Sequence, residues 1–92
     1  MEEKIAIIGL FVEDYESATA VNELLHKNGS KIIGRMGIPY REQGLNIISV
    51  IVHATGDEIS ALSGSLGRLK GVTVRSMQTS ISQKGINDHE EI

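Results

Sequence analysis

Cysteine is absent from the 92 residues of this chain, and so is tryptophan. Without cysteine the chain forms no disulfide bond, builds no thiolate zinc site and holds no cysteine-ligated iron–sulfur cluster. The three histidines, His26, His53 and His89, do not have the spacing of metal ligands. We therefore expect neither a metal site nor a cofactor.

Positive charge and long apolar runs are also scarce. Nine Lys and Arg residues stand against twelve Asp and Glu, which gives a net charge of −3. Proteins that bind the phosphate backbone of nucleic acids are usually basic, so we expect no direct DNA binding. No apolar run approaches the ~20 residues of a membrane-spanning helix, and no signal peptide is recognisable. The sequence predicts a cytoplasmic protein with no membrane partner.

Aromatic residues make up 3% of the chain, and Phe11 is the only one on the predicted central strands. RNA-recognition motifs need several such aromatics to stack bases. The segment GRMG at 34–37 looks like the loop with which KH domains clamp RNA, but that loop joins two helices and Pro39 prevents a second helix here. No catalytic triad, Walker loop or dinucleotide-binding glycine motif occurs. We predict no catalytic residues and no enzymatic activity.

Hydrophobic periodicity separates strands from helices along the chain. The order is βαββαβ, which with short right-handed connections folds as a ferredoxin-like plait. This α+β fold has a four-stranded antiparallel sheet with both helices on one face. We predict one such domain over 1–81 and a polar tail over 82–92. The predicted strands are 5–12, 31–38, 45–54 and 72–81, and the predicted helices begin near 14 and at 55.

The second predicted helix opens on TGDE, a capping box in which Thr55 and Glu58 bond reciprocally to each other's backbone amides. Away from its apolar face lie Gly64 and Gly67, although each interior glycine costs about 0.8–1 kcal/mol relative to alanine. Two explanations remain open: another backbone approaches this surface closely, or the helix tolerates the cost. The apolar face itself comprises Ile59, Leu62, Leu66 and Leu69.

The predicted central strands are apolar on both sides. In 5–12, Ile5, Ile7 and Phe11 alternate with an equally apolar set, and 45–54 repeats this pattern. Two helices cover only one face of the sheet, and a large exposed apolar patch usually marks an interface. We therefore expect a homo-oligomer formed through the open sheet face. The pattern alone does not tell which of the two sets points outward.

Several segments carry a family resemblance. VNELLHKNGSKIIGRMG at 21–37 resembles the first helix and second strand of ACT-like regulatory domains. VIVHATGDEISALSGSLGRLKGVTV at 50–74 resembles the second half of the sensor domain of nickel-responsive repressors. Over 4–80, and above all in RMGIPYREQGLNIISVIV and LKGVTVRSM, the chain is similar to the small stand-alone family of iron-only hydrogenase system regulators.

The resemblance implies a non-enzymatic regulator that binds a small-molecule effector, a protein partner, or both. ACT-type effectors sit at the first β-to-α turn, which here comprises Glu13, Asp14 and Tyr15, with Arg35 on a neighbouring strand as an anion partner. Nickel-responsive repressors also use a sheet cysteine, which is absent here, and a ribbon–helix–helix arm, for which we expect no counterpart. The alternative is a small ferredoxin-like enzyme with its site at the oligomer interface.

Overall fold

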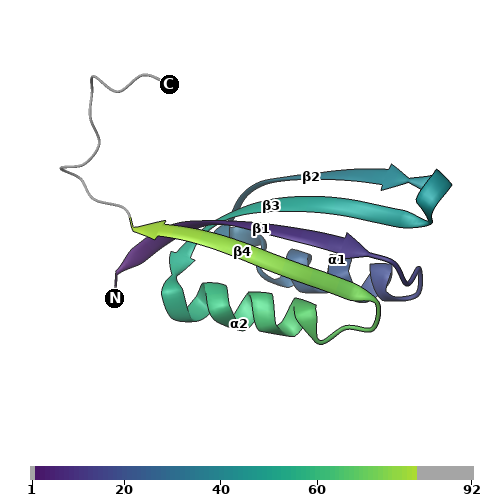
Figure 1. Cartoon of the computed structure of the whole chain (residues 1–92). Helices are drawn as coiled ribbons and strands as arrows, with labels where there is room; N and C mark the ends of the chain where they lie inside the picture. The colour runs from purple at the N-terminus through teal and green to yellow at the C-terminus, as the bar shows by residue number, and fades with distance from the viewer. Residues whose placement is uncertain (1, 81–92) are drawn as a thin grey trace, which may run out of the picture.

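The computed structural model describes residues 2–80. Its four strands form one antiparallel sheet in the order β2-β3-β1-β4, and both helices lie on one face of that sheet (Figure 1). This is the predicted ferredoxin-like plait. The predicted tail lies outside the described residues. The elements are β1 Glu3–Val12, α1 Ser17–Lys27, η1 Gly29–Lys31, β2 Ile32–Tyr40, η2 Arg41–Gln43, β3 Leu45–Thr55, α2 Gly56–Gly67 and β4 Val72–Ser80.

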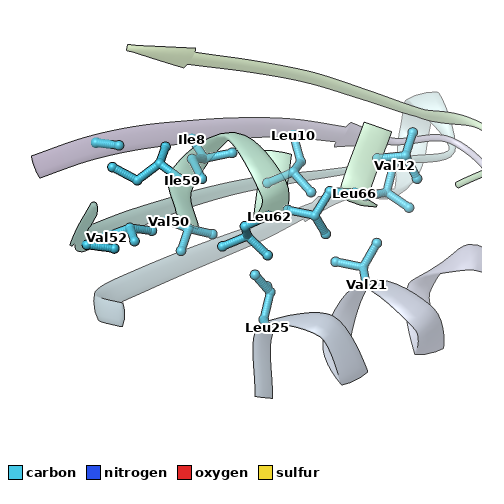
Figure 2. Packing of buried hydrophobic residues seen from close by; sticks show 13 residues of the cluster. Ile8, Leu10, Val12, Val21, Leu25, Val50, Val52, Ile59, Leu62 and Leu66 are labelled. Carbon is cyan, nitrogen blue, oxygen red and sulfur yellow. The ribbon is translucent and has the colours of Figure 1, made fainter. Parts of the chain in front are cut away.

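The core lies between the sheet and the helices. On β1 and β3 every buried residue is even-numbered, and Ile8 and Val50, which pair across the two strands, are fully buried. Their side chains meet Val21 and Leu25 from α1 and a row from α2 (Figure 2). The register therefore decides which apolar set is inside. The buried set is Ala6, Ile8, Leu10, Val12, Val21, Leu25, Val50, Val52, Ala54, Ile59, Leu62, Leu66 and Val72.

The predicted capping box begins α2. Thr55 Oγ1 accepts from Glu58 N at 3.2 Å, and Glu58 Oε1 accepts from Thr55 N at 3.0 Å. The bond from the Thr55 backbone N–H is the main reason why the pKa of Glu58 lies below its ordinary value. This carboxylate is therefore engaged in holding the start of α2.

Several boundaries differ from the prediction by a few residues, and two of the differences have a clear physical reason. Pro39 was expected to end the second strand, but β2 continues to Tyr40. Since β2 is an outer strand, the missing amide of Pro39 is tolerated there. The first helix starts at Ser17 rather than near Asp14, because Asp14 accepts a hydrogen bond within the preceding turn.

Candidate functional site

The sheet surface that faces away from α1 and α2, called here the open face, carries many exposed apolar side chains. The pairs Ile7–Ile51 and Phe11–Ile47 lie on it, at the centre of the sheet. Ile7 is 41% exposed and Phe11 49%. Residues paired directly across strands share a face, so the outer strands extend the same surface. Its exposed large apolar residues are Ile7, Phe11, Met36, Ile38, Tyr40 and Met77.

A hollow of about 250 Å³ lies on the open face over Gly9 and Ser49, which pair with each other. These small residues leave a depression beside the Phe11–Ile47 pair. Arg75, which is paired with Gly9 from the other side, adds a cation to the rim. Its Nη1 donates to the Val74 carbonyl oxygen at 2.9 Å. The open face is thus mainly apolar, with Arg75 at its β4 side.

The turn after β1 contains three of the predicted effector residues, and one of them is structural. Asp14 Oδ1 accepts from Glu16 N at 2.9 Å, and Asp14 Oδ2 lies 3.7 Å from Lys70 Nζ. The Asp14 side chain is only 20% exposed. Both carboxylate oxygens therefore hold the turn and the start of α1 in place.

The same turn packs on the loop between α2 and β4. Glu13 N donates to Gly71 O at 2.7 Å, and Ser17 Oγ donates to Lys70 O at 2.6 Å. Gly71 has φ +71°, and a Cβ there would lie 2.6 Å from the Asp14 Cβ. Only glycine fits this position, so the close contact between the two loops depends on Gly71.

A cleft of about 350 Å³, called here the turn cleft, opens between this turn and the β2–β3 hairpin. Glu13 and the 86% exposed Tyr15 line one wall. Tyr40 and Arg41 line the other. The cleft thus offers two aromatic rings, a carboxylate and a guanidinium to a small polar molecule. The complete lining is Val12, Glu13, Tyr15, Pro39, Tyr40, Arg41, Gly44, Leu45 and Asn46.

Arg35, the fourth predicted effector residue, lies apart from the turn cleft. It pairs with Val50 in the middle of β3, and its Nη2 donates to Asn22 Oδ1 on α1 at 2.9 Å. The cation that does reach the cleft is Arg41, which the sequence analysis did not select. The topology could have indicated Arg41, because in this plait the β2–β3 hairpin and the β1–α1 turn lie at the same end of the sheet.

Ionisable groups form no cluster suited to proton transfer or metal binding within residues 2–80. No three His, Asp or Glu side chains gather as ligands in that range. His53 Nε2 lies 2.8 Å from Glu3 Oε1, but both side chains are about half exposed.

A third surface lies between the helices. Ala20, Leu24 and Leu69 contribute to a groove of about 890 Å³ between α1 and the end of α2. Lys27 and Arg68 are among its charged lining residues. This groove contains none of the predicted effector residues.

Comparison with known proteins gives the family. Residues 4–76 match the TM1266-like family, described as "Iron-only hydrogenase system regulator, putative". The chain belongs to this family. A solved structure, that of the uncharacterized protein TM1266 from Thermotoga maritima, is 41% identical in sequence, with a TM-score of 0.79. The match covers 84% of the present chain and 98% of that one. No curated protein matches the chain.

Membership of the TM1266-like family confirms the predicted resemblance, and the structural match confirms the fold. The family's description places its members among regulators rather than among named enzyme classes. Across the described residues, no helix has the length and apolar character needed to span a membrane.

Proposed function

We propose that this TM1266-like protein is a non-enzymatic regulatory domain of the cytoplasm that self-associates through its open face. In this proposal it serves an iron-only hydrogenase system by binding a small effector or a protein partner. The observation that carries the proposal is the exposed apolar surface of the open face. The family description supports the regulatory role.

The size of the open face suits a dimer interface. Four strands about 4.8 Å apart and nine residues long cover roughly 600 Å² of flat area. A stable interface buries about 800 Å² on each partner, and projecting side chains raise the accessible area above the flat value. Within the strands, Arg75 is the only charge on this surface away from the Glu3–His53 pair at its end. A second copy would therefore cover mostly apolar atoms, as stable homodimer interfaces do.

Light scattering at micromolar concentration tests this self-association. We expect at least a dimer for the unaltered chain, and a smaller particle for Ile7→Lys, because a charge would be buried in the interface. Thr19→Lys, on the exposed surface of α1, is the matched control and should leave the mass unchanged. A folded monomer for the unaltered chain would refute the proposal.

The turn cleft is the effector site in this proposal. Glu13 and Tyr15 supply one wall, and Arg41 supplies the cation for an anionic group of the ligand. Asp14 contributes indirectly, by holding the turn. Arg35 stays a predicted effector residue, and from its position on β2, bonded to Asn22 of α1, it would contribute only to a ligand that extends along the helix.

A thermal-shift screen of metabolites tests the effector site. A compound that raises the melting temperature without being converted supports a sensor, whereas turnover supports the alternative of a small enzyme. With such a compound, Tyr15→Ala and Arg41→Ala should weaken binding at least tenfold. Arg68→Ala, which removes a guanidinium away from the turn cleft, is the matched control. Unchanged affinity in the first two variants would contradict the assignment of the cleft.

A further inference from the structure

The hollow on the open face exists because Gly9 has no side chain, and packing within the subunit does not require a glycine there. Gly9 lies in the interior of β1, where a glycine weakens a strand. Its φ is not positive, and a Cβ would meet only the Arg75 backbone oxygen, at 4.0 Å. A larger residue would therefore fit. A glycine inside a strand often marks the place where a ligand or another backbone approaches closely.

The residues around the hollow differ in chemistry from one end to the other. Phe11 and Ile47 form an apolar wall along one side. Ser49 contributes a hydroxyl on β3, whereas Thr73 and Arg75 contribute a hydroxyl and a guanidinium on β4. β1 lies between these two strands, and neighbouring strands are about 4.8 Å apart, so the two ends of the hollow are roughly 10 Å apart. The hollow is therefore a short apolar slot with a cation at one end.

The Arg75 guanidinium is available to an anion. Its side chain is exposed, and the bond from Nη1 to the Val74 carbonyl oxygen is its one hydrogen bond to residues 2–80. Within the same range no carboxylate forms an ion pair with it. A guanidinium has five N–H donors in a planar fork that matches a carboxylate. The donors that remain can bind a carboxylate at two points.

We propose that the hollow binds a free aliphatic carboxylate of medium chain length. The carboxylate lies on Arg75, and the chain crosses Gly9 against the apolar wall of Phe11 and Ile47. Charge complementarity favours this ligand over a purely apolar one, which would leave the guanidinium unused. The ligand differs from an effector in the turn cleft, because the two linings share no residue.

Enclosure of the chain rests on the proposed function, because a second copy on the open face would cover the hollow. An unfilled void in an apolar interface is destabilising, since the atoms around it lose contacts. The second copy also brings no strand carboxylate for Arg75, because the one on this face, Glu3, is bonded to His53 within residues 2–80. A bound carboxylate fills the void and pairs the cation. Binding and self-association therefore favour each other.

A thermal-shift titration with sodium octanoate tests the site, because the extended octanoate chain is about as long as the hollow. We expect octanoate to raise the melting temperature, and octylammonium, which has an equally long chain and the opposite charge, to give no rise. Arg75→Gln should weaken octanoate binding at least tenfold, whereas Arg68→Gln, in the groove between the helices, is the matched control. Binding that survives Arg75→Gln but is lost in Arg41→Gln would place octanoate in the turn cleft and overturn the proposal.

Gly9→Leu tests the hollow without touching the cation. The leucine side chain should fill the space and abolish the octanoate response, while the circular dichroism spectrum is retained because a Cβ has room. Gly37→Leu is the control, since Gly37 lies on β2 outside the hollow and a Cβ there makes ordinary contact with Ile48, at 3.9 Å. An unchanged octanoate affinity in Gly9→Leu would show that the ligand does not lie over Gly9.

Light scattering with and without octanoate separates this site from the proposed self-association. We expect octanoate to lower the dissociation constant of the unaltered dimer at least tenfold, and Gly9→Leu to assemble equally well with and without it. A loss of assembly in Gly9→Leu would mean that a side chain of the second copy fills the hollow, and the ligand site would be wrong. A monomer that binds octanoate through Arg75 would refute the self-association alone. A dimer that does not respond to octanoate would refute the site alone.

Discussion

Replacement of Gly71 by alanine is expected to be among the most damaging small changes in this protein. At φ +71° a residue with a Cβ costs about 1–2 kcal/mol relative to glycine. The new methyl group would also lie 2.6 Å from the Asp14 Cβ and 2.9 Å from the Asp14 backbone nitrogen. Relieving such overpacking typically costs about 1–3 kcal/mol more. We expect Gly71→Ala to lower the free energy of unfolding by about 2–5 kcal/mol.

Gly44 provides the matched control for this prediction. It has nearly the same φ, +63°, but a Cβ there meets nothing within 4 Å. Gly44→Ala should therefore lower the free energy of unfolding only through the positive φ. We expect a loss of about 1 kcal/mol, because alanine also reduces the entropy of the unfolded chain and so offsets part of the cost. Urea unfolding at one fixed protein concentration measures both, since self-association makes stability depend on concentration. Equal losses in the two variants would refute the argument that Gly71 is required by contact with Asp14.

Two further hydrogen bonds give predictions with controls. Thr55→Ala should cost about 1 kcal/mol, whereas Thr55→Ser keeps the cap and should cost little. The pKa of Glu58 is lowered in the folded state, so its favourable contribution is present above the ordinary carboxyl pKa and is lost as the pH falls through the lower folded value. Glu58→Gln, which does not titrate but keeps an oxygen for the Thr55 backbone N–H, should therefore lose less stability between about pH 5 and pH 3 than the unaltered chain does, and a parallel decline would argue against the cap. Ser17→Ala removes the bond to Lys70 O and should cost about 1 kcal/mol by urea unfolding, whereas no loss would show that water replaces it.

Some elements of this fold could be predicted because the interactions that define them are local. The capping box of Thr55 and Glu58 determines where α2 begins, and all its partners lie within four residues. The apolar stripe that starts at Ile59 determines which side of that helix is buried. The order of strands and helices, with short connections, then leaves the plait as the favoured topology.

Other boundaries depended on neighbours distant in sequence. A proline usually ends a strand in the interior of a sheet, because it lacks the amide that would bond to a neighbouring strand. β2 is an outer strand, so it continues past Pro39. Which residues of β1 and β3 are exposed also could not be read from their composition, since both alternating sets are apolar. Packing against Val21 and Leu25 buries the set that contains Ile8, and this leaves Ile7 on the open face.

The candidate site shows the same division. From the sequence, the resemblance to ACT-like domains pointed to the β1–α1 turn, whose residues Glu13 and Tyr15 line the turn cleft. Only the tertiary structure decided which arginine accompanies them. Arg35 and Arg41 are six residues apart on the same hairpin, and the pairing of β2 with β3 places Arg35 against α1 and Arg41 at the turn cleft. Strand register is a long-range property, so no local pattern distinguishes the two.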